Sequence, residues 1–217
     1  LVGYTNAGKS TVMRSVSQKT AYVKDELFAT LDTSTKRIKI DKSNSFILSD
    51  TVGFIRNLPD NLIASFRSTL GELSDSDLLL KIVDISSSEY EMHLESINTV
   101  LNYLKIDDKD FLIVFNKIDI LKDKVLIDKL KILYPKAIFI SAYKKLNIED
   151  LSKSIKKKIT KNNVKQKICV NYSQGKIIDQ IYNECEVINM IEEDNYLTFY
   201  VSAKENIINK ILDKIKK

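Results

Sequence analysis

Glycine and proline are scarce in this chain, with 5 and 2 residues among 217. A segment that stays disordered is usually rich in both and poor in apolar residues. Hydrophobic residues make up 44% of the chain, which is enough to bury a core. The length suits one domain of ordinary size and a second small one. The composition therefore argues against long disordered linkers.

Cysteine is almost as rare. Cys169 and Cys185 lie far apart and form no C-x-x-C pair. Two cysteines so far apart do not have the spacing of a metal site, and they are too few for a small disulfide-rich secreted domain. We expect two reduced thiols in a cytoplasmic protein.

Long hydrophobic runs are missing too. A membrane-spanning helix needs roughly 18 or more consecutive apolar residues, and no run approaches that length. No signal peptide is visible either, so we expect no membrane span. Positive charge is in small excess, with a formal net charge of +5. We interpret this excess as a solvated surface rather than a nucleic-acid-binding surface.

The most informative stretch stands at the start, where residues 3–10 read G-x-x-x-x-G-K-S. In a phosphate-binding loop, backbone N–H groups wrap the phosphates at a helix N-terminus. Lys9 would reach the β- and γ-phosphates, and the Ser10 hydroxyl would bind Mg²⁺. A chance glycine turn is the alternative, which the strand–loop–helix context disfavours. The expected nucleotide contacts here are Gly3, Tyr4, Thr5, Asn6, Ala7, Gly8, Lys9, Ser10 and Thr11.

Strand and helix patterns alternate over residues 1–160. Buried strands are expected at 78–84, 111–115 and 137–140, and helices at 11–19, 87–104, 122–133 and 147–159. This alternation predicts an α/β fold, a P-loop domain with a doubly wound, mostly parallel sheet. Two further strands at 36–41 and 45–49 suggest a hairpin, and Asp60 would cap a helix that runs to about Leu73.

A basic, polar stretch at 161–167 is the expected linker to a small α/β domain at 168–217. Strands are expected at 168–172, 186–193 and 196–202, with helices at 175–185 and 203–217, in the order β-α-β-β-α. A unit of this size has little core of its own, so we expect it to lean on the first domain. We also expect its tyrosines to pack in the core: Tyr172, Tyr182, Tyr196 and Tyr200.

Further polar sites fall at the ends of predicted strands, where open α/β sheets bind ligands. Asp50 would hold Mg²⁺ through a water, and the Gly53 N–H would face the γ-phosphate. Thr30, in a loop over 20–35, would ligate Mg²⁺ when the γ-phosphate is present. The nucleotide contacts expected in these two segments are Phe28, Ala29, Thr30, Asp50, Thr51, Val52 and Gly53. Taken singly, Asp50 is equally compatible with an ordinary turn.

The sequence Asn116-Lys117-x-Asp119 indicates which base is bound. A carboxylate at Asp119 would accept hydrogen bonds from guanine N1–H and its exocyclic amine, a donor pair that adenine lacks. Such a buried polar mismatch discriminates roughly 10⁴-fold. The backbone of Ser141 and Ala142 would reach the guanine O6. We therefore expect GTP rather than ATP.

With these residues assembled, the chain resembles the HflX family of translational GTPases. The likeness rests on residues 3–10, 27–32 and 50–56, which are similar to that family's phosphate loop and its first and second switches. The resemblance is strong over residues 1–160. The remainder resembles the family only in its position and in the arrangement of its expected elements. Thr33 stands where the family pattern has a proline. The resemblance implies a GTPase that binds the large ribosomal subunit and, in bacteria, splits stalled ribosomes.

The chain has no initiator Met, and Leu1-Val2 is short for the strand before the loop. We expect an N-terminal region, which in this family carries much of the ribosome contact, to be missing. We also expect a monomer. His93, the only histidine, is expected at the surface.

For mechanism, the resemblance assigns catalysis to Lys9, Thr30 and Gly53 around Mg²⁺. Phe54 stands where many GTPases have a water-orienting glutamine, so intrinsic hydrolysis would be slow without a partner. Asn6 matches a position that binds K⁺ in some related GTPases. Two alternatives stay open: a GTP-gated ribosome or RNA tether with negligible hydrolysis, and a GTPase of ribosome assembly or tRNA modification.

Overall fold

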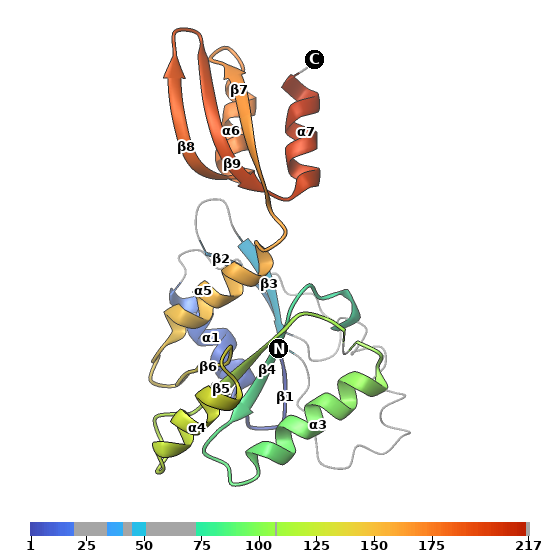
Figure 1. Cartoon of the computed structure of the whole chain (residues 1–217), viewed down its shortest axis with the longest axis vertical. Helices are drawn as coiled ribbons and strands as arrows, with labels where there is room; N and C mark the ends of the chain where they lie inside the picture. The colour runs from blue at the N-terminus through green and yellow to red at the C-terminus, as the bar shows by residue number, and fades with distance from the viewer. Residues whose placement is uncertain (20–33, 41–44, 51–72, 107, 216–217) are drawn as a thin grey trace. The chain divides into compact units, whose positions relative to one another are not determined.

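The computed structural model describes residues 1–19, 34–40, 45–50, 73–106 and 108–215. It divides into two compact units. The first comprises Leu1–Ile38 and Ile47–Ile155, and the second Lys39–Phe46 and Lys156–Lys217. In Figure 1 the colour changes from yellow to orange near the second boundary.

The first unit is built on a 4-stranded sheet in the order β1-β4-β5-β6, with all neighbouring strands parallel. The strands are β1 (Val2–Gly3), β4 (Leu79–Asp84), β5 (Phe111–Asn116) and β6 (Ile138–Phe139). Every residue of β4 before Asp84 is buried, as the near-continuous apolar sequence requires of a strand covered on both faces. The expected parallel α/β fold is confirmed.

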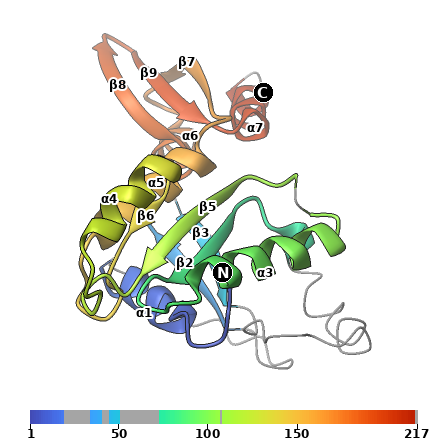
Figure 2. The same ribbon diagram turned by 60° about the horizontal axis from the view of Figure 1, so that its bottom comes forward.

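Helices lie on both faces of this sheet (Figures 1 and 2), with α3 on one face and α1 and α5 on the other. Their bounds are α1 (Lys9–Lys19), α3 (Tyr90–Tyr103), α4 (Val125–Leu133) and α5 (Ile148–Ile159). The α3 residues Leu94, Ile97 and Leu101 pack in one core cluster with Val83 and Phe115 of the sheet. This apolar stripe at helical spacing fixes α3 against the sheet.

The expected strand pair is present as β2 (Ser34–Lys39) and β3 (Ser45–Asp50), which form a 2-stranded sheet. The Leu1 amino group donates a hydrogen bond to the Ser49 carbonyl over 2.6 Å. This contact places the end of β3 beside the start of β1. Asp50 therefore lies near the loop that follows β1.

The second unit has the predicted β-α-β-β-α order and its own apolar core. Its elements are β7 (Val164–Asn171), α6 (Gly175–Glu184), β8 (Glu186–Glu193), β9 (Tyr196–Ala203) and α7 (Glu205–Ile215). The antiparallel sheet has the order β7-β9-β8. Ile168, Phe199 and Ile211 are among the residues buried between sheet and helices.

Two expectations for this unit are corrected. The stretch 161–167, expected to be a linker, contains the first part of β7, because Val164 already pairs with Ala203. Residues Val164–Lys167 are all exposed, so the strand shows no apolar alternation there. Sequence periodicity reveals a strand only when one of its faces is buried. This part of β7 has no buried face and is held by backbone pairing, so the periodicity does not reveal it.

The tyrosines of the second unit are not in its core. Tyr172, Tyr182, Tyr196 and Tyr200 are 46%, 44%, 47% and 37% exposed. Side chains alternate between the two faces of a strand. Leu197, Phe199 and Val201 occupy the buried face of β9, which leaves Tyr196 and Tyr200 on the opposite face.

The helix expected after Asp60 and the loops at 20–33 and 51–60 lie outside the described residues. Within the described ranges, no helix is both long enough and apolar enough to cross a membrane.

Candidate nucleotide-binding site

The phosphate-binding loop connects β1 directly to α1. The Ala7 N–H donates to the Tyr4 carbonyl over 3.2 Å, and the Val12 N–H donates to the Gly8 carbonyl over 2.8 Å. The first bond closes a turn and the second is in the opening turn of α1. Asn6 and Gly8 both have a positive φ, 61° and 93°. The loop therefore ends at a helix N-terminus, the geometry that binds phosphate through backbone N–H groups.

The two glycines of the motif are required by close packing. A Cβ at Gly3 would lie 2.4 Å from the Ile82 carbonyl oxygen of the neighbouring strand. At Gly8 a Cβ would lie 2.4 Å from the Asn116 Nδ2 atom, and the positive φ there already disfavours other residues. The motif thus fixes the loop against both β4 and the end of β5.

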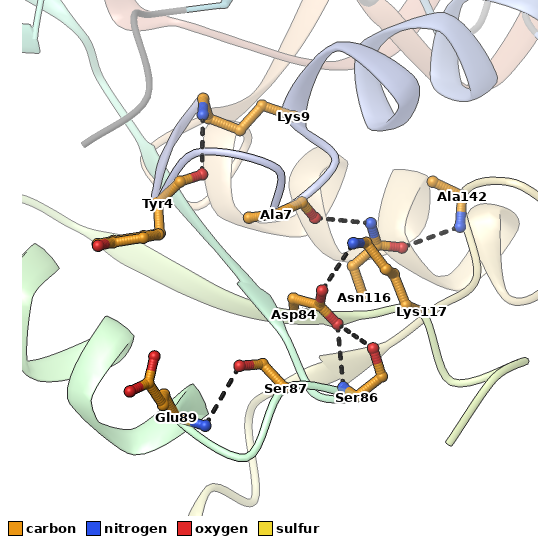
Figure 3. Close-up of polar contacts among 10 residues, drawn as sticks. All are labelled: Tyr4, Ala7, Lys9, Asp84, Ser86, Ser87, Glu89, Asn116, Lys117 and Ala142. Atoms are coloured by element: carbon orange, nitrogen blue, oxygen red, sulfur yellow. Dashed lines mark hydrogen bonds and ion pairs between the residues drawn. The ribbon is translucent and has the colours of Figure 1, made fainter. Parts of the chain in front are cut away.

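Lys9 is only 7% exposed and folds back over the loop. Its Nζ atom donates to the Gly3 and Tyr4 carbonyls, both at 3.1 Å, and Figure 3 shows the second contact. Burial lowers the pKa of the Lys9 ammonium, and the Asp50 carboxylate opposes this by raising it. The loop carbonyls and the carboxylate keep a buried positive charge where phosphates would bind.

Ser10 and Asp50, the two described residues expected to hold Mg²⁺, lie in direct contact. The Ser10 hydroxyl donates to Asp50 Oδ2 over 2.5 Å, although the residues are 40 positions apart. In the described part of the chain, the buried Asp50 Oδ1 has no hydrogen-bond partner. A hydroxyl and a carboxylate are hard oxygen ligands of the kind Mg²⁺ takes together with nucleotide phosphates. The donor set present therefore fits the ion.

A site held by protein groups alone is not found. Among the described residues there is no cluster of three or more His, Cys, Asp or Glu side chains arranged to hold a metal ion. Mg²⁺ is often bound by few protein ligands, with phosphates and waters supplying the rest. The Ser10–Asp50 pair is consistent with that type of site.

Asn116 joins three segments of the site. Its side chain is nearly inaccessible, with the residue 2% exposed. Nδ2 donates to the Ala7 carbonyl over 2.9 Å, and Oδ1 accepts from the Ala142 N–H over 3.0 Å (Figure 3). The sequence predicts Asn116 and Ala142 as nucleotide contacts but does not predict that they bond to each other. Asn116 thus links the phosphate loop, the end of β5 and the segment after β6.

The segment after β6 is a compact turn. Ser141 is fully buried, and its Oγ accepts the Lys144 N–H over 3.0 Å. The Ser141 and Leu146 backbones exchange hydrogen bonds of 3.2 and 3.0 Å. The Ile118 N–H donates to the Ile140 carbonyl over 3.2 Å, which ties the Asp119 loop to this turn. The expected base-binding segments therefore lie next to each other at the carboxyl edge of the sheet.

Asp84 was not predicted to take part. It ends β4, and its Oδ2 forms a 2.6 Å ion pair with Lys117 Nζ, as Figure 3 shows. Its position supplied a usable signal, since a carboxylate directly after a buried parallel strand lies at the ligand-binding edge.

His93 is buried, contrary to the surface position expected. The residue is 9% exposed, and its ring stacks on Tyr4. The reason is helical periodicity, because His93 is four residues before Ile97 on the inward stripe of α3. It therefore contacts the phosphate-binding loop.

The comparisons with known proteins agree with this geometry. The profile of the family described as "50S ribosome-binding GTPase" matches residues 1–117. GTPase HflX of Magnetococcus marinus is 31% identical over all of this chain and 50% of its own length. The chain belongs to the HflX family of GTPases.

Other relatives agree. GTPase HflX of Escherichia coli K12 is 33% identical over 93% of this chain and 48% of its own length. A crystal structure of a GTP-binding protein from Sulfolobus solfataricus in complex with GDP has a TM-score of 0.58 and 31% identity, covering 74% of this chain and 51% of that one. The chain thus spans about half the length of the curated relatives it matches.

Several predicted site residues lie outside the described part of the chain. They are Phe28, Ala29, Thr30, Thr51, Val52, Gly53 and Phe54. Their assigned roles stay predictions. The residues that the structure does place come from the phosphate loop, the end of β3, the end of β5 and the turn after β6.

Proposed function

We propose that this chain binds GTP with Mg²⁺, hydrolyses it to GDP and phosphate, and acts in the cytoplasm at the large ribosomal subunit. The observation that carries the nucleotide part is Asn116, which bonds to both the phosphate loop and the Ala142 segment. This side chain joins the phosphate-binding and base-binding parts into one site. The ribosomal part is supported by the family description and by the HflX relatives.

Within this proposal, each residue has a definite task. The loop N–H groups and Lys9 hold the β- and γ-phosphates and stabilise charge on the transferred group. Ser10 and Asp50 would hold Mg²⁺, which neutralises the phosphate oxygens when bound. Thr30 and Gly53 would contact the γ-phosphate end, and Asp119 would select guanine. Asn6 would bind K⁺.

The test is GTP turnover by this chain with and without purified large ribosomal subunits, in Mg²⁺ buffer containing K⁺. Stimulation by the subunits supports the proposal. Lys9→Met, which keeps the length of the side chain but removes its charge, is the control that should abolish turnover in both conditions. GTP binding with no turnover in either condition would contradict hydrolysis by this chain.

A GTP-gated tether is the second candidate, favoured by Phe54 at the position of a water-orienting side chain. Such a tether would co-sediment with large subunits in the presence of GTP and not of GDP. Adding large subunits would leave its GTP turnover unchanged. An assembly or tRNA-modification role would instead show no binding to mature large subunits. Replacing K⁺ by Na⁺ tests the Asn6 assignment, which predicts slower turnover in Na⁺.

A further inference from the structure

Asp84 and Lys117 are brought together by the register of the sheet. β4 and β5 are parallel neighbours in which Asp84 pairs with Asn116, the residue before Lys117. The Ile85 N–H also donates to the Asn116 carbonyl over 3.1 Å. Both side chains therefore start from adjacent strand ends, and the backbone fixes their separation.

The Asp84 carboxylate is oriented by the turn that follows it. Its Oδ1 accepts the Ser86 N–H over 3.0 Å and the Ser86 hydroxyl over 2.6 Å. An aspartate that bonds to a backbone N–H two residues ahead forms an Asx turn. With Oδ1 occupied, Oδ2 is directed at Lys117 Nζ, 2.6 Å away. Figure 3 shows this chain of contacts from Ser86 through Asp84 to Lys117.

Lys117 has an unusual backbone. Its φ of 67° lies in the left-handed region, which is unfavourable for a lysine and persists where the surroundings impose it. The Ile120 N–H bonds back to the Lys117 carbonyl over 3.3 Å. Lys117 therefore sets the course of the turn that carries Asp119, the proposed guanine ligand.

We infer that Asp84 is a positioning residue for base recognition. Its ion pair with Lys117 holds the turn at residues 117–120 in one conformation. That conformation directs the side chains of Asp119 and Lys117 toward the guanine ring. Ser86 supports it by fixing the carboxylate. This inference rests on the proposed guanine-nucleotide function and adds two residues to it.

A purely structural ion pair would behave differently. The side chains of Asp84 and Lys117 are 17% and 31% exposed, and partly solvated pairs usually contribute little to stability. A structural role predicts a small loss of stability and equal effects on every ligand. A positioning role predicts that base-dependent binding is weakened while phosphate binding is retained.

The experiment compares GDP and pyrophosphate binding to the full chain and its variants by calorimetry in Mg²⁺ buffer. Asp84→Asn keeps an oxygen acceptor for Ser86 and removes the charge. It should weaken GDP binding by about tenfold, a size common for coupling between contacting residues, and leave pyrophosphate affinity unchanged. Asp128→Asn is the matched control, since it removes an exposed carboxylate paired with Lys131 on α4. It should change neither affinity.

A double-mutant cycle with Lys117→Met completes the test. If Asp84 acts through Lys117, adding Asp84→Asn to Lys117→Met causes no further loss of GDP affinity. The inference would be overturned if the losses of GDP affinity in the two single variants added up in the double variant. It would also be overturned if Asp84→Asn weakened GDP and pyrophosphate binding equally, or if it behaved like the control. If Asp84→Asn does not fold, Ser86→Ala is measured in its place. It should lower the affinity for GDP by a smaller factor and leave the affinity for pyrophosphate unchanged. Wild-type chain without preference for GDP over ADP would instead refute the proposed function.

Discussion

The ring of Tyr4, in the phosphate-binding loop, stacks on the imidazole of His93 in α3, with ring centroids 4.1 Å apart and an angle of 17° between the planes. The only histidine of the chain thus supports the loop from the side. Tyr4 also accepts a hydrogen bond from Lys9 through its carbonyl. Helix α3 and Lys9 are therefore connected through Tyr4.

Replacing His93 by alanine should loosen this support. We expect a loss of stability of about 1–2 kcal/mol from the lost ring contact and the remaining cavity, with weaker GDP binding. His93→Phe keeps a flat ring and should retain most of both properties. Urea unfolding and GDP titration of the two variants check this. Equal behaviour of the alanine and phenylalanine variants would contradict the role of the stack.

Gly8→Ala should remove nucleotide binding without unfolding the protein. The added Cβ meets Asn116 Nδ2, at 2.4 Å, and the positive φ adds strain. The loop or Asn116 has to move, and either shift disturbs the phosphate site. Gly175→Ala is the matched control, because no atom lies within 4 Å of a Cβ there. GDP titration of both variants, with circular dichroism for folding, measures the difference.

Asp50→Asn should reduce the effect of Mg²⁺ on nucleotide affinity. The variant keeps a side chain that can accept the Ser10 hydroxyl, but it removes the charge that would attract the ion. GDP affinity is measured with Mg²⁺ and with EDTA. In the wild type the two values should differ by more than in Asp50→Asn. An unchanged Mg²⁺ dependence would place the ion elsewhere.

The second unit offers a direct test of buried against exposed aromatic residues. Phe199 is fully buried, whereas Tyr200 is 37% exposed. Phe199→Ala should cost about 3–5 kcal/mol in this unit, and Tyr200→Ala should cost less than about 1 kcal/mol. Urea unfolding of the full chain, followed by circular dichroism, compares them. Similar losses would mean that the two faces of β9 are wrongly assigned.

Much of this fold can be predicted from sequence because its buried strands are apolar throughout. Strand β4 and the motif at residues 3–10 predict a parallel sheet with a phosphate loop. Sequence periodicity failed where the burial was not apolar. Val164–Lys167 pair through their backbone with exposed side chains, and His93 is a polar residue on an inward stripe.

Sequence motifs name the residues of the candidate site, but they do not predict most of the contacts between those residues. Asn116, Ser10 and Asp50 stand in recognisable motifs, since nucleotide chemistry restricts which side chains can occupy those positions. The pairing of Asp84 with Lys117 depends on the register between β4 and β5. One sequence does not specify that register, so the contact becomes visible only in the folded chain.

The central claim is that the carboxyl edge of this sheet binds guanine nucleotides through Asp119. The most direct measurement is a titration of the full chain with GDP, ADP and xanthosine diphosphate, repeated with Asp119→Asn. We predict that the wild type binds GDP roughly 10⁴-fold more tightly than ADP. The variant should prefer the xanthine nucleotide, since an amide can donate to the xanthine C2 carbonyl. Comparable affinities of the wild type for GDP and ADP would contradict the account.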